Sequence, residues 1–245
     1  MLHYNTNFQY HSNENIVIIW QAKAACTLVN HMFYHHEKLL ETALEYSSWI
    51  HDYRQMIRKI KGVDTDIFLE FKVVNPSTKY IQFTVNPYKR AVSSYMHALT
   101  HRYIGKENTN ISFHEFIDKL LVNLIKENVH HNLQTFLFKK KGKINKIDYI
   151  HMEKINENIH YLKDKYNLRY VIPSENQCHK RFSSKDKKTN CSFIGNINWE
   201  SIKNINPIHY NVFYNDEIKN KVYTLYKEDF YNLGYTWEMF INTKY

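Results

Sequence analysis

Two apolar runs, each followed by a segment with helical spacing, dominate the pattern of hydrophobic and polar positions. Residues 16–20 are continuously apolar, which is typical of a buried strand. Thr27 is then expected to act as the N-cap of a helix whose apolar residues recur every three or four positions. Residues 80–85 form the second run, and Asn86 with Pro87 is expected to open the next helix. Both blocks therefore predict a strand that leads through a short turn into a helix.

Weaker patterns predict the elements between these blocks and after them. Helical spacing indicates single helices over residues 39–60 and 155–166, and alternation indicates a strand over residues 67–74. Ser112 and Glu115 have the spacing of a capping box. The helix that this box opens is expected to continue to about residue 125.

The end of the chain is expected to hold one more strand and one long helix. Residues 170–172 are interpreted as the last core strand, and residues 173–198 as a polar loop. Asn215 is expected to start a closing helix that stops at Gly234. Strands alternating with helices indicate an α/β fold with a central, mostly parallel sheet flanked by helices. At 245 residues, a single domain over residues 1–245 is expected, with its core at about residues 15–235.

Composition adds a preference for an anionic partner. The net charge of +9 favours a nucleotide, an acidic or sulfated glycan, nucleic acid or a membrane surface, without choosing among them. No run approaches the length of a membrane span and no signal-peptide core is visible, so a soluble, cytoplasmic protein is expected. Cys26, Cys178 and Cys191 are too few for a disulfide framework, although a Cys178–Cys191 bridge stays open. Zinc-ligand spacings are absent, and no metal is expected.

The turn over residues 21–27 carries the clearest candidate chemistry. A strand, a tight loop and a helix N-terminus together can bind an anion, because backbone N–H groups and the helix dipole point at it. Lys23 would add a full charge to such a site. The first glycine is Gly62, so neither a Walker-type loop nor a dinucleotide fingerprint is present. The alternative is an ordinary strand-to-helix connection.

The second block offers a similar candidate. Arg90 and Ser93 lie one helical turn apart, so both can reach a ligand at the carboxyl end of the preceding strand. The alternative is that Arg90 is a surface charge and Ser93 a small packing residue. His31 and His35 share a helix face and could form a metal pair, but no third ligand is near in sequence, which favours a packed or solvated role.

Together the two blocks resemble the cofactor-binding segments of the sulfotransferase superfamily, close to the membrane-type carbohydrate sulfotransferases. Residues 22–27 (AKAACT) are similar to the family's P-K-T/A-G/A-C/S-T segment, with Ala22 in place of the proline. Residues 86–95 (NPYKRAVSSY) are similar to R-D/N-P-Y-x-R-x-V-S-x-Y, with Val85 at the position of the first arginine. Weaker similarity extends the resemblance from about residue 16 to residue 235.

The resemblance implies a P-loop-like three-layer fold and transfer of a sulfuryl group from 3′-phosphoadenosine 5′-phosphosulfate, without a metal. The acceptor would be a hydroxyl of a glycan or small molecule. Lys23 would act on the bridging oxygen, and Glu70 is the first choice for the catalytic base, with Asp66 and His51 behind it. The residues that it assigns to the cofactor are Ala22, Lys23, Ala24, Ala25, Cys26, Thr27, Arg90, Ser93 and Arg181.

Three other classes remain open. Val85 and the positive charge fit a non-catalytic relative that binds nucleotides or sulfated glycans. A nucleic-acid-binding module is suggested only by charge, since no recognisable motif supports it, and we expect no nucleic-acid partner. A kinase is disfavoured because the glycine-rich loop is missing.

Overall fold

The computed structural model describes residues 7–61, 77–101, 104–105, 109–125, 130–135, 146–172, 192–205 and 209–242. These residues belong to two compact units, one from residues 1–84 and 134–179 and the other from residues 85–133 and 180–245. The first unit contains the sheet, and the described part of the second is mainly helical. The single domain expected over residues 1–245 stays a prediction.

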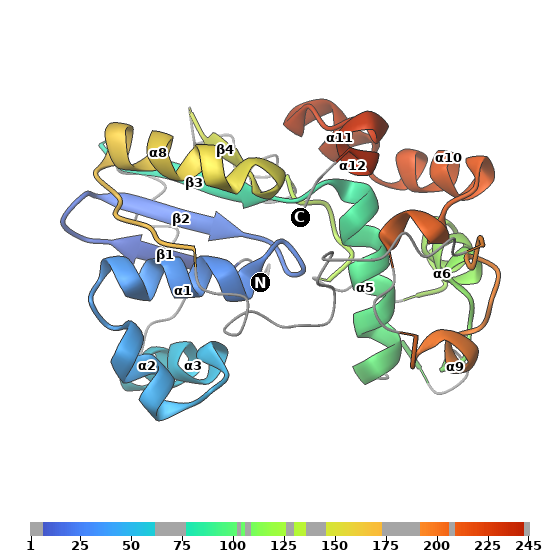
Figure 1. Cartoon of the computed structure of the whole chain (residues 1–245), viewed down its shortest axis with the longest axis horizontal. Coiled ribbons are helices and arrows are strands. Elements are labelled where there is room, and N and C mark those ends of the chain that lie inside the picture. Colours follow the sequence, from blue (N-terminus) through green and yellow to red (C-terminus); the bar gives the residue numbers. More distant parts are fainter. Residues whose placement is uncertain are drawn as a thin grey trace. The chain divides into compact units, whose positions relative to one another are not determined.

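Within the described ranges, the sheet of the first unit has four strands in the order β1-β2-β3-β4 (Figure 1). β1 (Asn7–His11) runs antiparallel to β2 (Ile16–Trp20), whereas β2, β3 (Lys79–Thr84) and β4 (Asp148–His151) are parallel. The expected α/β class with a mostly parallel sheet is confirmed. Trp20 pairs with Phe83, so the carboxyl ends of β2 and β3 lie at one edge of the sheet.

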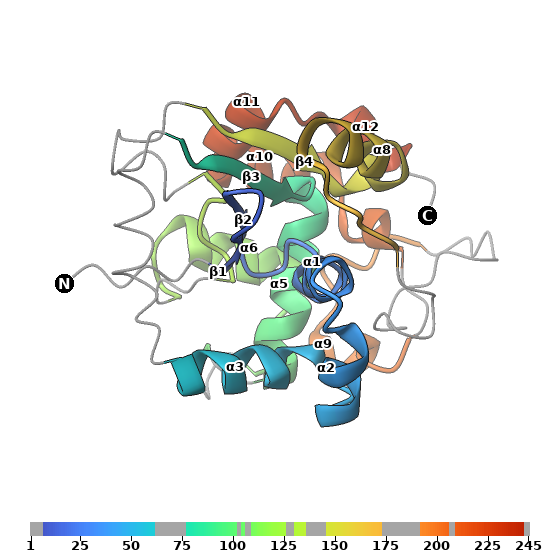
Figure 2. The ribbon, with the colours of Figure 1, turned by 90° about the vertical axis from the view of Figure 1, so that its left-hand side faces the viewer.

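The alternation of side chains along the strands separates two faces of this sheet. One face carries Gln9, which donates to Asn30 of α1 (Cys26–His36) at 3.3 Å. Asp148 lies in the same cross-strand row as Gln9 and accepts from Tyr161 of α8 (Ile155–Tyr166) at 2.7 Å. α1 and α8 therefore cover the same face, as Figure 2 shows. The opposite face carries an apolar cluster of Phe8, Val17, Ile19 and Tyr80.

The helix expected over residues 39–60 is broken into α2 (Leu40–Tyr46) and α3 (Ile50–Lys61), so the prediction of one helix was wrong. Ser47 is extended, with φ −158°, and its hydroxyl accepts from the Trp49 N–H at 3.1 Å. The same hydroxyl donates to Asp52 at 2.8 Å. Such local side-chain hydrogen bonds compete with the helical ladder and favour a turn.

Two predicted strands have different outcomes. The strand expected over residues 67–74 lies outside the described residues. Residues 170–172 form no strand, which corrects the expectation of a last core strand. Tyr170 is buried, but the Val171 side chain is 51% exposed, and the Tyr170 hydroxyl bonds Nε2 of His11 at 2.8 Å. A side-chain anchor, rather than strand pairing, fixes this segment.

Elements of the second unit pack around aromatic residues of one long helix. The described helices and turn of the second unit are α5 (Pro87–His101), α6 (Phe113–Leu121), α9 (Trp199–Ile202), η4 (Tyr210–Phe213), α10 (Asp216–Leu225), α11 (Lys227–Leu233) and α12 (Trp237–Ile241). Tyr95 of α5 is fully buried against Phe113 and Phe213, and its hydroxyl donates to the Ile111 carbonyl at 2.9 Å. Tyr88, two turns earlier, contacts Phe230 and Trp237.

Helix ends in the second unit test the predicted caps. The Ser112–Glu115 capping box is present, and Asn215 accepts from the Ile218 N–H as an N-cap. Gly234 ends α11 in the left-handed conformation, as expected. Two lengths were wrong: α6 ends at Leu121 rather than near residue 125, and the closing helix is divided between α10 and α11. The first unit also contains the short turn η2 (Met152–Lys154).

Candidate functional site

The turn between β2 and α1 has an unusual backbone for a segment without glycine. Lys23 and Ala25 both have positive φ, 66° and 56°, with Ala24 between them. The Ala24 N–H donates to the Gln21 carbonyl at 3.0 Å, which closes the turn. Backbone conformations of alternating hand direct neighbouring N–H groups to one side, an arrangement that binds anions in many proteins.

The N-terminus of α1 adds to this site because no side chain caps it. The N-cap is Ala25, and the first turn contains no acidic residue. The expectation that Thr27 caps the helix was therefore wrong: the left-handed Ala25 starts the helix earlier, and Thr27 is already its second residue. Ala22 and Ala24 are buried, whereas Lys23, Cys26 and Thr27 are partly exposed. Uncapped N–H groups beside an accessible lysine suit an anionic ligand.

A histidine from α3 lies beside this helix N-terminus. Nε2 of His51 is 3.3 Å from Oγ1 of Thr27, and the side chain of His51 is buried. Trp49 packs edge-on against the His51 ring with centroids 5.3 Å apart, while 47% of its surface remains exposed. Of the three candidate bases, His51 is thus placed at the loop, and Glu70 and Asp66 lie outside the described residues.

Arg54, one turn after His51 on α3, contacts the end of β2, which the sequence did not indicate. Its guanidinium carbon lies 5.7 Å from the centroid of the Trp20 ring, at the end of β2. A cation over an indole face is a favourable contact. Trp20 and Arg54 are more than thirty positions apart, so their contact has no local signal and the sequence alone did not reveal it.

The second predicted segment has its own geometry at the start of α5. Asn86 caps the helix through Oδ1, which accepts from the Tyr88 N–H at 3.1 Å, and Pro87 is the first helical residue, as predicted. Arg90 is only 1% exposed, and its Nη1 donates to the Asn132 carbonyl at 2.6 Å. It is therefore not the solvated surface charge of the alternative interpretation. Ser93 is partly exposed.

The remaining expectations concern residues outside the loop and the thiol of Cys26. Val85, at the position where the resembling family has arginine, is 4% exposed. Arg181, Cys178 and Cys191 lie outside the described residues. Cys26, at the start of α1, carries a free thiol. The assignments of Ala22–Thr27, Arg90, Ser93 and Arg181 to a cofactor stay predictions.

Two further findings are negative. None of the helices in the described ranges combines the length and apolar character required to cross a membrane. Searches with protein-family models, against curated proteins and against solved structures found no match to this chain.

Proposed function

We propose that the chain is a sulfotransferase that moves the sulfuryl group of 3′-phosphoadenosine 5′-phosphosulfate to a hydroxyl of a glycan or small molecule. The observation that carries the proposal is the uncapped N-terminus of α1 behind two left-handed residues, one of them Lys23. The proposal includes a P-loop-like three-layer fold, in which this loop replaces the missing glycine-rich one. The resemblance of residues 22–27 and 86–95 to the family's segments supports it.

The proposed reaction is an in-line displacement at sulfur. The acceptor oxygen forms a bond to sulfur as the bond to the bridging oxygen breaks, and 3′-phosphoadenosine 5′-phosphate leaves. Lys23 stabilises the charge that develops on the bridging oxygen, and N–H groups of Ala25–Thr27 hold the 5′-phosphate, since the Ala24 N–H is already bonded to the Gln21 carbonyl. These groups are fixed before the substrate arrives, which is the condition for effective stabilisation of the transition state.

The acceptor proton must pass to a base. His51 is a candidate because its ring contacts Thr27, next to the proposed phosphate site, and a neutral imidazole accepts a proton near pH 7. Glu70 is the alternative that the sequence favours. Ser93, Arg90 and Arg181 are proposed for the 3′-phosphate on the resemblance alone. Because Arg90 is buried, Ser93 is the better candidate for direct contact.

Calorimetric titration with 3′-phosphoadenosine 5′-phosphate, beside adenosine 5′-phosphate, tests the nucleotide assignment. We expect a preference for the 3′-phosphorylated nucleotide, and loss of sulfuryl transfer in Lys23→Ala by about 100-fold or more. Lysine and alanine both carry a Cβ, so the substitution does not change the backbone strain at position 23, where φ is 66°. Lys163→Ala, an exposed lysine of α8, is the matched control. Normal turnover of Lys23→Ala would refute the proposed mechanism.

A second candidate is a non-catalytic protein that binds nucleotides or sulfated glycans. The buried Val85 favours it, since an apolar side chain cannot pair with a phosphate. Binding of the 3′-phosphorylated nucleotide without sulfuryl transfer to any hydroxyl acceptor would select this alternative.

A further inference from the structure

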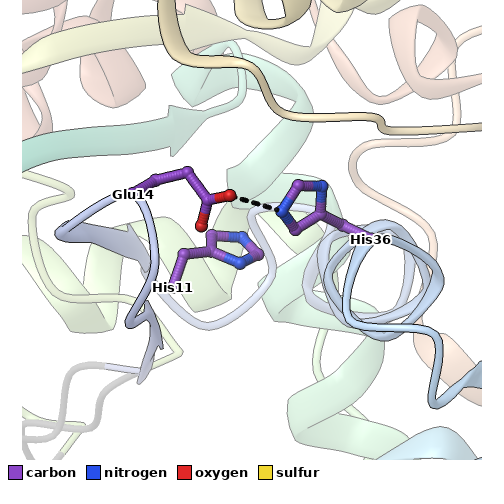
Figure 3. A group of neighbouring side chains, drawn as sticks. All are labelled: His11, Glu14 and His36. Atoms are coloured by element: carbon purple, nitrogen blue, oxygen red, sulfur yellow. Dashed lines mark hydrogen bonds and ion pairs between the residues drawn. The ribbon is translucent and has the colours of Figure 1, made fainter.

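A cluster of imidazole and carboxylate groups lies away from the loop, where β1, the following turn and the end of α1 meet. His11 ends β1, Glu14 lies in the turn before β2, and His36 is the last residue of α1. Figure 3 shows the three side chains pointing toward one another. Their ligand atoms all lie within 4.8 Å of one another.

The distances suit a small divalent cation. Nε2 of His36 and Oε1 of Glu14 are 3.3 Å apart. Two ligand atoms of a tetrahedral zinc ion are separated by about 3.4 Å when each is about 2.1 Å from the metal. Glu37 bonds Nδ1 of His11, so Nε2, which bonds the Tyr170 hydroxyl, is the ring atom that can ligate an ion once that hydrogen bond opens. A carboxylate behind a ligating histidine is the usual arrangement at metal sites, because it fixes the tautomer and orientation of the ring.

The charges of the cluster also favour a cation. His11 is fully buried, and the side chains of His36 and Glu14 are only 11% and 15% exposed. Two carboxylates lie at the cluster: Glu14 bonds His36, and Glu37 bonds His11. Shielded carboxylates are costly unless a positive charge compensates them.

We propose that His11, Glu14 and His36 bind one divalent transition-metal ion, with Glu37 orienting His11. Two imidazoles and one carboxylate form a donor set that suits zinc and its neighbours rather than magnesium or calcium, which prefer oxygen. The hydroxyl of Tyr170 is 2.8 Å from Nε2 of His11, so the ion would displace it from this nitrogen and have it as a neighbouring oxygen. The site is separate from the proposed sulfotransferase loop and does not depend on that activity.

Binding requires two contacts to open, the hydrogen bond between Nε2 of His11 and the Tyr170 hydroxyl and the one between Nδ1 of His36 and the Arg169 N–H. Nδ1 of His36 accepts the Arg169 N–H at 2.9 Å, so in the metal-free chain Nε2 carries the proton and donates to Glu14. A neutral histidine that ligates through Nε2 carries its proton on Nδ1 instead. That proton would face the Arg169 N–H, and two donors repel. The ion is therefore expected to release the Arg169 amide while it fixes the turn around Glu14.

Titration of the tag-free, metal-stripped chain with Zn²⁺ tests the proposal, and Co²⁺ absorption reports the ligand geometry. We expect one ion per chain, affinity reduced more than about 100-fold in His36→Ala and Glu14→Gln, and reduced about 10- to 100-fold in Glu37→Gln. His35→Ala is the matched control, because His35 is exposed, precedes His36 in α1 and bonds only outside the cluster, to the Arg169 carbonyl. Amide exchange should become faster at Arg169 in the presence of Zn²⁺.

These results distinguish one specific metal site from non-specific binding by surface histidines. The chain has 15 histidines, so weak binding with several ions per chain, equally affected by His35→Ala and His36→Ala, would overturn the proposal. So would wild-type affinity in Glu14→Gln, a variant that keeps the side-chain size and can still accept from His36. Thermal unfolding of each variant without metal shows whether a lost affinity reflects a lost fold.

Discussion

Ala25 allows the stability of the chain and its affinity for an anion to be changed in opposite directions. It is the N-cap of α1, has φ 56° and ψ 34°, and provides no side-chain cap. Ala25→Asp places a carboxylate at the helix N-terminus, where the proposed 5′-phosphate would bind. Ala25→Asn has nearly the same shape without the charge, so it is the matched control.

The expected magnitudes follow from the backbone and from Coulomb's law. A left-handed residue other than glycine costs about 1–2 kcal/mol, and asparagine and aspartate adopt this conformation most readily. Both variants should therefore be more stable than the wild type by about 0.5–1 kcal/mol. A negative charge at a helix N-terminus adds about 0.3–1 kcal/mol in Ala25→Asp. The same charge about 5 Å from a bound anion costs about 3 kcal/mol at an effective dielectric constant of about 20, or more than about 100-fold in affinity.

Urea unfolding and calorimetric titration with 3′-phosphoadenosine 5′-phosphate measure the two quantities on the same samples. The expected result is a more stable chain in both variants and loss of nucleotide affinity in Ala25→Asp alone. Wild-type affinity in both variants would show that no anion binds at this helix N-terminus. A large loss in both would show that the side chain obstructs the site by its size, and the electrostatic reasoning would fail.

Three further predictions concern single residues. His51→Gln is expected to lower turnover about 100-fold or more with nucleotide affinity within about twofold of wild type, in a comparison of rate and calorimetry; unchanged turnover would return the role of base to Glu70. Burial lowers the pKa of His11 below its usual 6.5, so the unfolded chain binds the extra proton first as the pH falls. The contribution of His11 to stability is therefore complete above about pH 7 and decreases as the pH drops through 6.5. Urea unfolding at a series of pH values should show a weaker dependence of stability on pH in His11→Gln, and an unchanged dependence would assign it to other groups. Gly195→Ala is expected to destabilise the chain by about 1–3 kcal/mol or more, since a Cβ there would lie 2.4 Å from the Phe213 carbonyl oxygen. Gly234→Ala meets no atom within 4 Å and should cost only the about 1–2 kcal/mol of its left-handed backbone, so a greater loss at Gly234 than at Gly195 would contradict the steric argument.

Elements with strong local signals were predictable from the sequence. Asn86 and Pro87 open α5, Ser112 and Glu115 form their capping box, and Gly234 ends α11. Each signal acts through hydrogen bonds or backbone angles within a few residues, so no knowledge of the fold is required. The buried strands β2 and β3 were equally clear, because continuous apolar runs are typical of parallel strands buried on both faces.

Features that depend on distant parts of the chain were missed. β1 was missed for a different reason: it pairs with the neighbouring β2 across a tight turn, but its period-two signal is limited to Phe8 and Tyr10. The pattern over residues 170–172 was strand-like, yet the buried Tyr170 bonds His11 from the other end of the unit instead. The cluster of His11, Glu14 and His36 was invisible for the same reason. Its members are scattered over 26 positions, with no spacing that resembles a metal motif.

The strain stored in the β2–α1 turn is the strongest physical reason to expect a ligand there. Among the described residues other than glycine and asparagine, Lys23, Ala25 and Lys38 have positive φ, so two of the three lie in this loop. Each costs about 1–2 kcal/mol, and the missing N-cap costs about 1 kcal/mol more. Strain of this kind persists where function requires the geometry. Glycine at either position, or serine at the cap, would remove much of the cost. The proposed anion, by accepting from the uncapped N–H groups of Cys26 and Thr27 and pairing with Lys23, would offset both contributions at once.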